Sequence, residues 1–340
     1  MRLKKWSGNP ILSPKPDSDW ESMAVLNPGA VYDGHKVSLL YRASGEIVDY
    51  RIYIGLAESR DGFHFERVSD QPVLGPSEDG FDAGCIEDAR VAKIDGAYFM
   101  TYAARAHPPC AHWSGRKRQN LPAQTPTWTE NITRSGIASS TDLRHWRRLG
   151  PCTSEYLDNR DVILFPERIK GKYVMIHRAI DRTGGQRFPQ YKTAALWLTY
   201  SDDMQTWTGD VAIARPQAPW EGDWLGGAAP PIRTDDGWLT LYHAVSDFDG
   251  KGRAYRVGAM LLDLENPQAI VARGPDFILE PEAPFEMKGC GAAERVVFPC
   301  GNVVIGDELF VYYGGADTVC CVATAKLADV LAWLRTFKSS

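Results

Sequence analysis

Charged and histidine side chains lie at the ends of several β-like segments of this sequence. Asp88 comes just before one such segment, and Arg178 and His243 come at the ends of two others. A carboxyl group can protonate a leaving oxygen, and guanidinium and imidazole groups can hold an anion. The residues with this placement are Arg42, Asp88, Arg90, Glu167, His177, Arg178, His243 and Asp317. They would suit bond cleavage by an acid and an anionic nucleophile, provided that the fold brings them to one place.

Taken singly, these residues also have ordinary structural explanations. Asp88 would serve as a turn residue or as the partner of an arginine, and Glu167 as an acceptor of backbone hydrogen bonds. A lone histidine such as His177 or His243 is more often a hydrogen-bonded core residue than a catalytic one. The functional interpretation therefore depends on the elements that carry them.

Five segments share one pattern: a strand, a turn that contains glycine, and a second strand that ends near an aromatic residue or histidine. They are residues 27–43, 86–104, 164–179, 227–245 and 296–317. Alternating β-branched and aromatic residues around a DG, KG or GD turn are typical of a β-hairpin. The aligned positions lie about 60–75 residues apart, which leaves room for four strands per repeat. These positions are Tyr41, Tyr102, His177, His243 and Tyr313.

A second motif follows each hairpin, a strand that runs into a turn. Its copies are residues 53–67, 135–150, 195–209, 256–270 and 319–334. Only the last copy keeps apolar residues at helical spacing, which predicts a short C-terminal helix. Five such units predict an all-β fold, a single five-bladed β-propeller domain over residues 1–340. We expect the aligned positions on the innermost strands, so that the charged residues converge on a central funnel.

The amino-acid composition excludes some classes of binding partner. The formal net charge is −5, and Lys and Arg do not cluster, so neither nucleic acid nor an anionic membrane is expected to bind. The sequence has no signal peptide and no apolar run of about 18 residues, which predicts a soluble, cytoplasmic protein. The seven cysteines lack CxxC spacing, so we expect reduced thiols and no metal site. Nothing in the sequence specifies an oligomeric state.

Carboxylates and arginines in a funnel suit glycoside cleavage, in which an acid protonates the leaving oxygen while a nucleophile attacks from the opposite face. Asp88 is a single acid with several cations opposed to it. That combination favours an anionic nucleophile, and phosphate fits it. Glu87, as the strand neighbour of Asp88, should point to the other face and matter mainly for stability.

The segments that carry these residues resemble glycoside hydrolase family 130, the mannoside phosphorylases and β-mannosidases. The similar segments are FDAGCIEDARVAKIDGAYFMTY, DNRDVILFPERIKGKYVMIHRA, PWEGDWLGGAAPPIRTDDGWLTLYHAV and YYGGADTVCCVATAKL. The resemblance extends from Asn9-Pro10 to the predicted C-terminal helix. It implies a five-bladed propeller that acts on β-mannosides with inversion and, in phosphorylases, forms α-mannose 1-phosphate. Inorganic phosphate is then the co-substrate, and no cofactor is implied.

The resemblance also assigns roles residue by residue. Asp88 matches the family's general acid, which relays its proton through a sugar hydroxyl, although Ala89 stands where the family usually has proline. The positions that match phosphate ligands are Arg160, Arg178 and His243. The positions that match ligands of the cleaved sugar are Asn27, Arg42, Arg90, Tyr102 and Asp317.

One expected phosphate ligand is missing. The family has a lysine where this chain has Trp224, within Asp223-Trp224-Leu225-Gly226. The lost charge predicts phosphorolysis with a weakened phosphate KM, unless Arg182 or Arg187 compensates. Alternatively, Asp223 acts as a base for water and the protein is an inverting β-mannosidase. A noncatalytic sugar-binding propeller is the third alternative.

Residues 106–131 form a long, proline-rich segment without periodicity, which is typical of a functional rim or lid. Trp113, Arg116 and Lys117 are its candidates for contact with the outer part of a sugar substrate. The linkage and the acceptor sugar depend on such outer contacts.

Overall fold

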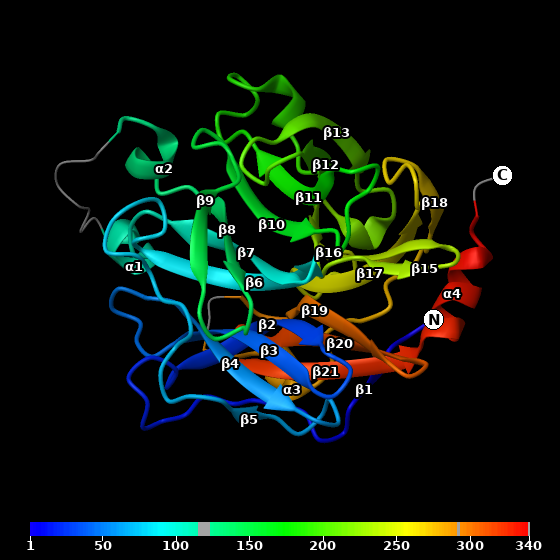
Figure 1. The fold of residues 1–340 in the computed structure, drawn as a ribbon, viewed down its shortest axis with the longest axis horizontal. Coiled ribbons are helices and arrows are strands. Elements are labelled where there is room, and N and C mark those ends of the chain that lie inside the picture. The colour runs from blue at the N-terminus through cyan, green and yellow to red at the C-terminus, as the bar shows by residue number, and fades with distance from the viewer. Residues whose placement is uncertain (115–122, 291–292, 339–340) are drawn as a thin grey trace.

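The computed structural model describes residues 1–114, 123–290 and 293–338. These residues form five antiparallel sheets that follow one another along the chain in a five-bladed propeller arrangement (Figure 1). This confirms the predicted fold class. The first strand of each sheet lies innermost, since β2, β6, β10, β14 and β19 contact one another across the centre.

In the first three blades, four strands follow one another in chain order from the centre outward. Blade one has β2 (Ala24–Tyr32), β3 (Val37–Ser44), β4 (Tyr53–Ser59) and β5 (Glu66–Arg67). Blade two has β6 (Cys85–Ile94), β7 (Ala97–Arg105), β8 (Arg134–Ser140) and β9 (Arg147–Pro151). Blade three has β10 (Asp158–Leu164), β11 (Tyr173–Ile180), β12 (Leu196–Ser201) and β13 (Thr208–Ala214).

Blades four and five each depart from this pattern. Blade four has β14 (Trp224–Gly227), β16 (Gly237–Ser246), β17 (Ala254–Leu262) and β18 (Ile270–Arg273), with β15 (Ile232–Thr234) also paired to β16. Blade five has β19 (Val297–Ile305), β20 (Glu308–Gly315) and β21 (Val319–Lys326), and its outermost strand is β1 (Lys4–Lys5). Strand β1 therefore joins the two ends of the described chain in one sheet.

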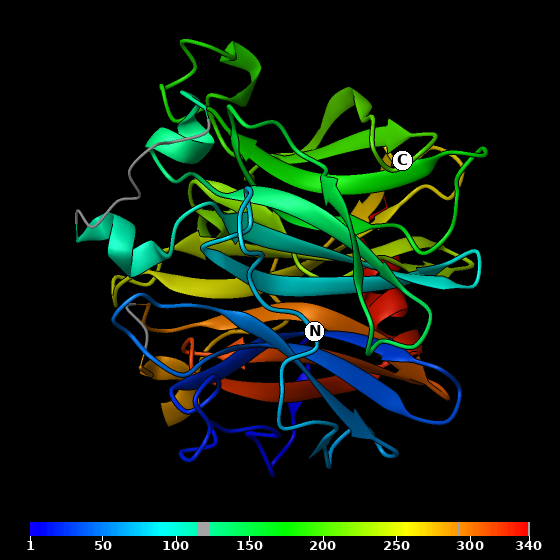
Figure 2. The same cartoon turned by 60° about the vertical axis from the view of Figure 1, so that its left-hand side comes forward.

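Short helices lie between and beside the blades. They are α1 (Pro109–Trp113), α2 (Pro126–Thr129), α3 (Pro284–Met287) and α4 (Leu327–Arg335), with 3-10 turns η1 (Pro189–Tyr191) and η2 (Pro219–Glu221). Helices α1 and α2 project from one side of the molecule (Figure 2). Helix α4 buries Val330, Leu331 and Leu334, which confirms the C-terminal helix. No helix in the described ranges is long and apolar enough to cross a membrane.

In four blades the predicted hairpin turns link the first and second strands, whereas in blade four the DG turn at Asp236 and Gly237 follows β15 and leads into β16. Asp95 and Gly96, between β6 and β7, both have positive φ (50° and 85°), and so do Lys170 and Gly171 (51° and 79°). Positive φ at both central residues is the requirement of a type I′ turn, which favours glycine at the second position. The DG and KG signals thus have a direct conformational cause.

A buried carboxylate stabilises four of the blades in the same way. It precedes the innermost strand, accepts a hydrogen bond from a tyrosine of the second strand, and pairs with a cation of the outermost strand. The sets are Glu21–Tyr41–Arg67, Asp82–Tyr102–Arg148, Glu221–Tyr242–Arg273 and Glu286–Tyr313–Lys5. In blade three, His177 replaces the tyrosine and lies 3.5 Å from Asp210.

These sets correct the prediction about the aligned positions. The tyrosines and His177 lie on the second strand of each blade, not on the innermost strand, because the innermost strand is the first of each hairpin. In blade four, the equivalent residue is Tyr242 rather than His243. A shift of one residue turns a strand side chain to the other face. His243 therefore corresponds to Arg42 and Arg178, which follow the aligned residue in blades one and three.

Candidate active site

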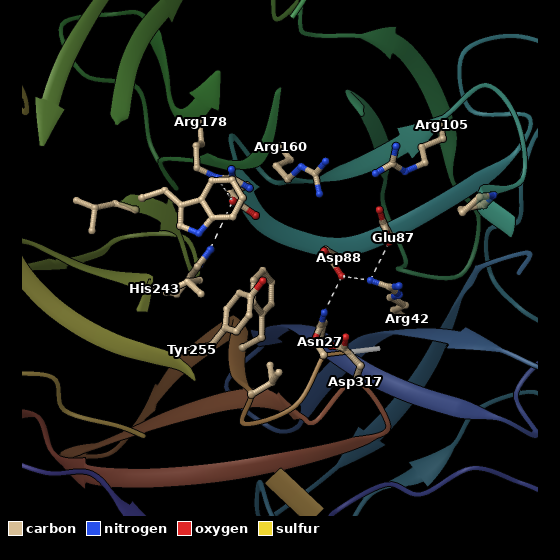
Figure 3. Close-up of a pocket in the computed structure, with 18 of the residues that line it drawn as sticks. Asn27, Arg42, Glu87, Asp88, Arg105, Arg160, Arg178, His243, Tyr255 and Asp317 are labelled. Atoms are coloured by element: carbon tan, nitrogen blue, oxygen red, sulfur yellow. Dashed lines mark hydrogen bonds and ion pairs between the residues drawn. The ribbon is translucent and has the colours of Figure 1, made fainter. Parts of the chain in front are cut away.

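A pocket of about 330 Å³ opens where the innermost strands begin and the second strands end (Figure 3). An antiparallel hairpin brings these two points to the same end of each blade. The starts of β2, β6 and β10 contribute Asn27, Asp88 and Arg160, while the ends of β3 and β11 contribute Arg42 and Arg178. Residues that are far apart in sequence thus meet because each blade repeats the same hairpin.

Three of the innermost strands carry a β-bulge where they reach the pocket. Asn27, Asp88 and Asp161 lie at these bulges with φ of 48°, 58° and 57°. Asn and Asp tolerate this left-handed conformation better than other non-glycine residues, which explains their recurrence. The prediction that Glu87 points away from Asp88 is wrong, because the bulge interrupts the alternation and both side chains line the pocket.

The carboxylates gather on one side of the pocket around Arg42. Asp88 Oδ1 accepts hydrogen bonds from Asn27 Nδ2 at 2.8 Å and from Arg42 Nη1 at 3.0 Å. No hydrogen bond from a described residue reaches Asp88 Oδ2. The same Arg42 nitrogen lies 2.8 Å from Glu87 Oε2. Asp88 is therefore held through one oxygen, and the other is available to a ligand.

Asp317 lines the same side of the pocket without a side-chain hydrogen bond from the described residues. Burial raises the pKa of its carboxyl to about 6, and the neighbouring charges of Asp88 and Glu87 add to the rise, whereas Arg42 opposes it. Its turn between β20 and β21 also has positive φ, 52° at Asp317 itself. Asp317 thus changes charge near neutral pH, which is unusual for an aspartate.

Cations occupy the opposite side. Arg178 Nε donates to Asp161 Oδ2 at 2.7 Å, and no described residue accepts from its two terminal nitrogens. Arg160 pairs with Asp158 at 3.0 Å through Nε, and its Nη1 likewise has no partner in the described chain. Such a fork with free terminal N–H groups binds planar or tetrahedral oxyanions well. This side of the pocket can hold phosphate.

Asp161 supplies a negative charge among the basic side chains of the cationic side and so reduces their mutual repulsion. It lies 3.1 Å from Arg90 Nη2 and 3.6 Å from His243 Nε2, in addition to its contact with Arg178. Burial alone would raise the pKa of this carboxyl, but the neighbouring side chains Arg178, His243 and Arg90 hold the pKa well below the usual range. Burial lowers the pKa of His243 to about 4. Before an anion binds, His243 is therefore a neutral side chain at pH 7.

Other predicted residues lie outside the pocket lining. Arg90 is 2% exposed and holds the backbone oxygen of Asp88 at 2.9 Å, so it contacts the acid loop rather than the pocket. Tyr102 is buried and its hydroxyl donates to Asp82, because the alternation of β7 directs it between sheets. Neither side chain lines the pocket, and their contacts with a sugar stay a prediction.

Three further candidates are also separate from the pocket. Asp223 is exposed and does not line it, although the adjacent Trp224 does. Glu167 forms an exposed pair with Arg233 at 2.8 Å. His177 is buried against Asn159. The carboxylate of Asp223 thus lies outside the lining that contains Asp88.

Of the two arginines predicted to compensate for Trp224, the structure brings one to the pocket. Arg182 lines it and pairs with Asp158 through Nε at 2.9 Å. Arg187 does not line it and stacks on Tyr156 at 5.1 Å from the ring centroid. Trp224 itself lies under the guanidinium of Arg178, whose central carbon is 5.1 Å from the ring centroid.

Sequence reasoning missed several pocket residues. They are Tyr50, Arg105, Asp161, Tyr255 and Phe298, and Glu87 in addition. Asp161 could have been found, since it stands at the same point of the third hairpin as Asp88 in the second. Tyr50 comes from an irregular loop and carries no periodic signal; it accepts a hydrogen bond from Arg42 Nη2 at 3.1 Å.

The predicted rim contributes Pro109 of α1 to the pocket. Arg116, Lys117 and the side chain of Trp113 lie outside the described residues. Among described residues, no group of three or more His, Cys, Asp or Glu side chains is arranged to hold a metal ion.

Comparison with known proteins assigns the family. The sequence profile of glycoside hydrolase family 130, described as beta-1,4-mannooligosaccharide phosphorylase, matches residues 2–336. The chain belongs to glycoside hydrolase family 130. This confirms the resemblance seen in the sequence.

Members of family 130 similar to this chain include two proteins of Thermoanaerobacter sp. (strain X514). A 1,2-beta-oligomannan phosphorylase is 38% identical over 97% of this chain and 99% of its own length. A beta-1,2-mannobiose phosphorylase is 37% identical over 97% and 99%. The solved structure of the beta-1,2-mannobiose phosphorylase from Listeria innocua, in complex with beta-1,2-mannobiose, has a TM-score of 0.79 and 26% identity, covering 99% of this chain and all of that one.

Proposed function

We propose that this family 130 protein is an inverting phosphorylase of β-1,2-linked mannosides that uses inorganic phosphate as co-substrate. The observation that carries the proposal is the division of one pocket into a carboxylate side around Asp88 and a cationic side around Arg178 (Figure 3). Inversion needs the acid and the nucleophile on opposite faces of the sugar. The names of the two similar Thermoanaerobacter proteins support the β-1,2 linkage.

In the proposed reaction, a phosphate oxygen forms a bond to the anomeric carbon while the bond from that carbon to the leaving oxygen breaks. A proton from Asp88 passes to the leaving oxygen, directly or through a sugar hydroxyl, so that the acceptor sugar leaves as a neutral alcohol. The products are α-mannose 1-phosphate and the shortened sugar. Arg160, Arg178 and His243 are the proposed phosphate ligands.

On the sugar side, Asn27, Arg42 and Asp317 are the proposed ligands, because all three line the pocket beside Asp88. Arg90 is proposed to act indirectly: it fixes the backbone oxygen of Asp88 and one oxygen of Asp161. Through these contacts Arg90 joins the acid side to the cationic side.

Hydrolysis by a water molecule is the competing reaction. The exposed position of Asp223, outside the pocket lining, counts against the base that hydrolysis was expected to use. The free terminal nitrogens of Arg178 favour an anion in its place.

The test is incubation of the purified protein with β-1,2-, β-1,3- and β-1,4-mannobiose and longer β-1,2-mannosides, with and without phosphate. We expect activity that saturates with phosphate, produces α-mannose 1-phosphate and is highest on β-1,2 linkages. Free mannose formed at an equal rate without phosphate would contradict the proposal.

A further inference from the structure

A second recess opens beside the pocket and shares part of its wall. The recess has a volume of about 430 Å³, and the residues common to both cavities are Trp224, Val245, Tyr255 and Ala293. Of these residues, Trp224 belongs to the cationic side, because it lies against Arg178, whereas Tyr255 lies between His243 and Asp317 (Figure 3). The recess thus approaches the proposed phosphate position from the Trp224 side.

The charged residues of the recess are Lys251, Arg253, Glu294 and Arg295. Arg295 is neutralised by Asp249, with which it forms an ion pair at 2.6 Å. Arg253 is exposed and has no hydrogen bond or ion pair within the described ranges. It lies against Trp224, with its guanidinium carbon 5.6 Å from the ring centroid.

The indole of Trp224 therefore contacts the guanidinium groups of both Arg178 and Arg253. Since both guanidinium carbons are measured from the same ring centroid, Arg253 and Arg178 lie at most about 11 Å apart, comparable with the Debye length of about 8–10 Å at about 0.1–0.15 M salt. A phosphate beside Arg178 would therefore feel the charge of Arg253 partly screened, and more strongly at low salt. The indole fixes the direction of an arginine that would otherwise be mobile in solvent.

We propose that inorganic phosphate enters and leaves through this recess, and that Arg253 is the outer cation of its route. This inference rests on the proposed phosphorolysis. A phosphate dianion that came past Glu87, Asp88 and Asp317 would meet three carboxylates. The recess carries three cationic side chains and one carboxylate, Glu294, and Arg178 lies on the pocket side of Trp224. A sugar has no net charge and can enter past the carboxylates. The two substrates would then have separate approaches.

The test is steady-state kinetics of Arg253→Ala with each substrate varied in turn. We expect the phosphate KM to rise about threefold to tenfold, the effect of one unit charge on a dianion near this distance, while the sugar KM and kcat at saturating phosphate stay unchanged. In the reverse direction, the KM for α-mannose 1-phosphate should rise as well. The wild-type phosphate kcat/KM should fall with added salt, and Arg253→Ala should reduce this dependence.

Two variants complete the design. Glu294→Gln removes the negative charge of the same recess, so it should lower the phosphate KM. Arg60→Ala removes an equally exposed arginine from a different cavity and should leave both KM values unchanged.

The inference is overturned if Arg253→Ala matches Arg60→Ala, or if it raises the sugar KM instead. An enzyme that releases free mannose without phosphate overturns both this inference and the proposed function. A phosphate-dependent enzyme that is indifferent to Arg253 overturns the inference alone.

Discussion

Asp88 is held by hydrogen bonds to one carboxylate oxygen, in a left-handed conformation that asparagine also adopts readily. Asp88→Asn should therefore fold normally but lack the proton for the leaving oxygen. We expect kcat to fall by roughly 10²–10⁴-fold, the usual loss for a general acid. Circular dichroism and thermal unfolding would establish that the fold is intact.

Glu87→Gln is the matched control for Asp88→Asn. It removes a neighbouring carboxylate that pairs with the same nitrogen of Arg42, yet it leaves the proposed acid in place. Its kcat should fall far less. Near-normal turnover in folded Asp88→Asn would exclude Asp88 as the acid.

Arg178 offers two terminal nitrogens to the pocket. Arg178→Ala should raise the phosphate KM by about 10- to 100-fold, because hydrogen bonds to charged groups contribute about 1.5–3 kcal/mol. The sugar KM should change little. Arg182→Ala is the comparison, since Asp158 already holds Nε and Nη2 of Arg182, and its effect should be smaller. Equal effects on both KM values would place Arg178 in sugar binding instead.

The raised pKa of Asp317 links activity to stability. The folded pKa of about 6 lies above the ordinary value of 3.8, so the unfolded chain ionises this carboxyl first as pH rises. The stability contributed by the protonated form is complete below about pH 4 and is lost as pH rises to about 6. Asp317→Asn, which has no such titration, should gain free energy of unfolding relative to wild type across that window, about 3 kcal/mol at about 1.4 kcal/mol per pKa unit.

Urea unfolding of both proteins at pH 4 and pH 8 would check this expectation. A constant difference between them would show that Asp317 does not titrate in this window. The variant should also lose activity, because Asp317 lines the pocket beside Asp88.

At the scale of elements, the hairpins were predictable from sequence and the bulges were not. Glycine turns and alternating apolar residues specify a hairpin locally, and they located the five second strands and the first strands of blades one, two and five. They missed most of β10 and β14, which begin before the predicted segments. A bulge depends on how a strand packs at the centre, so alternation placed Glu87 on the wrong face. Similarly, the recurrence of an aromatic residue could not distinguish Tyr242 from His243, since both neighbours fit the pattern.

Residues of the candidate site were predictable from sequence where they stand at equivalent positions of the repeated hairpins. Arg42, Arg178 and Asp88 were found because each stands at a repeated point of a hairpin, and all three line the pocket. Arg105 and Tyr50 also line it. Arg105 ends β7, two residues beyond the position that is equivalent to Arg42, and Tyr50 lies in a loop. Nothing local marks such residues, because only the closed ring brings them inward.

Substitution of Tyr102 tests whether the sets of carboxylate, tyrosine and cation stabilise the blades. Its hydroxyl donates to Asp82, which also pairs with Arg148 at 2.8 Å. Tyr102→Phe should lower the free energy of unfolding by about 0.5–1.5 kcal/mol, the typical value of one hydrogen bond, and leave the sugar KM unchanged. A raised sugar KM without loss of stability would instead restore Tyr102 to the sugar site.

At the scale of the whole molecule, the ring is closed by strand β1. Lys5 Nζ lies 2.6 Å from Glu286, whose side chain has no exposed surface. Lys5→Ala would leave that carboxylate without its cation, which should lower the free energy of unfolding by about 1–4 kcal/mol. Lys4→Ala, at the exposed neighbouring position, should have almost no effect. Thermal unfolding of the two variants is the measurement, and equal melting temperatures would contradict this role for Lys5.

The pairing of β1 with β21 also sets the order of events during synthesis. Lys5 pairs with Ala323, so β1 leaves the ribosome well before its partner strand and waits for it. At a translation rate of about 5–20 residues per second, this interval is roughly 15–60 s. Blades one to four can form while β1 and Lys5 still lack their partners β21 and Glu286. The nascent protein therefore keeps β1 unpaired until β21 has been made, and this strand is where a chaperone would protect it most usefully.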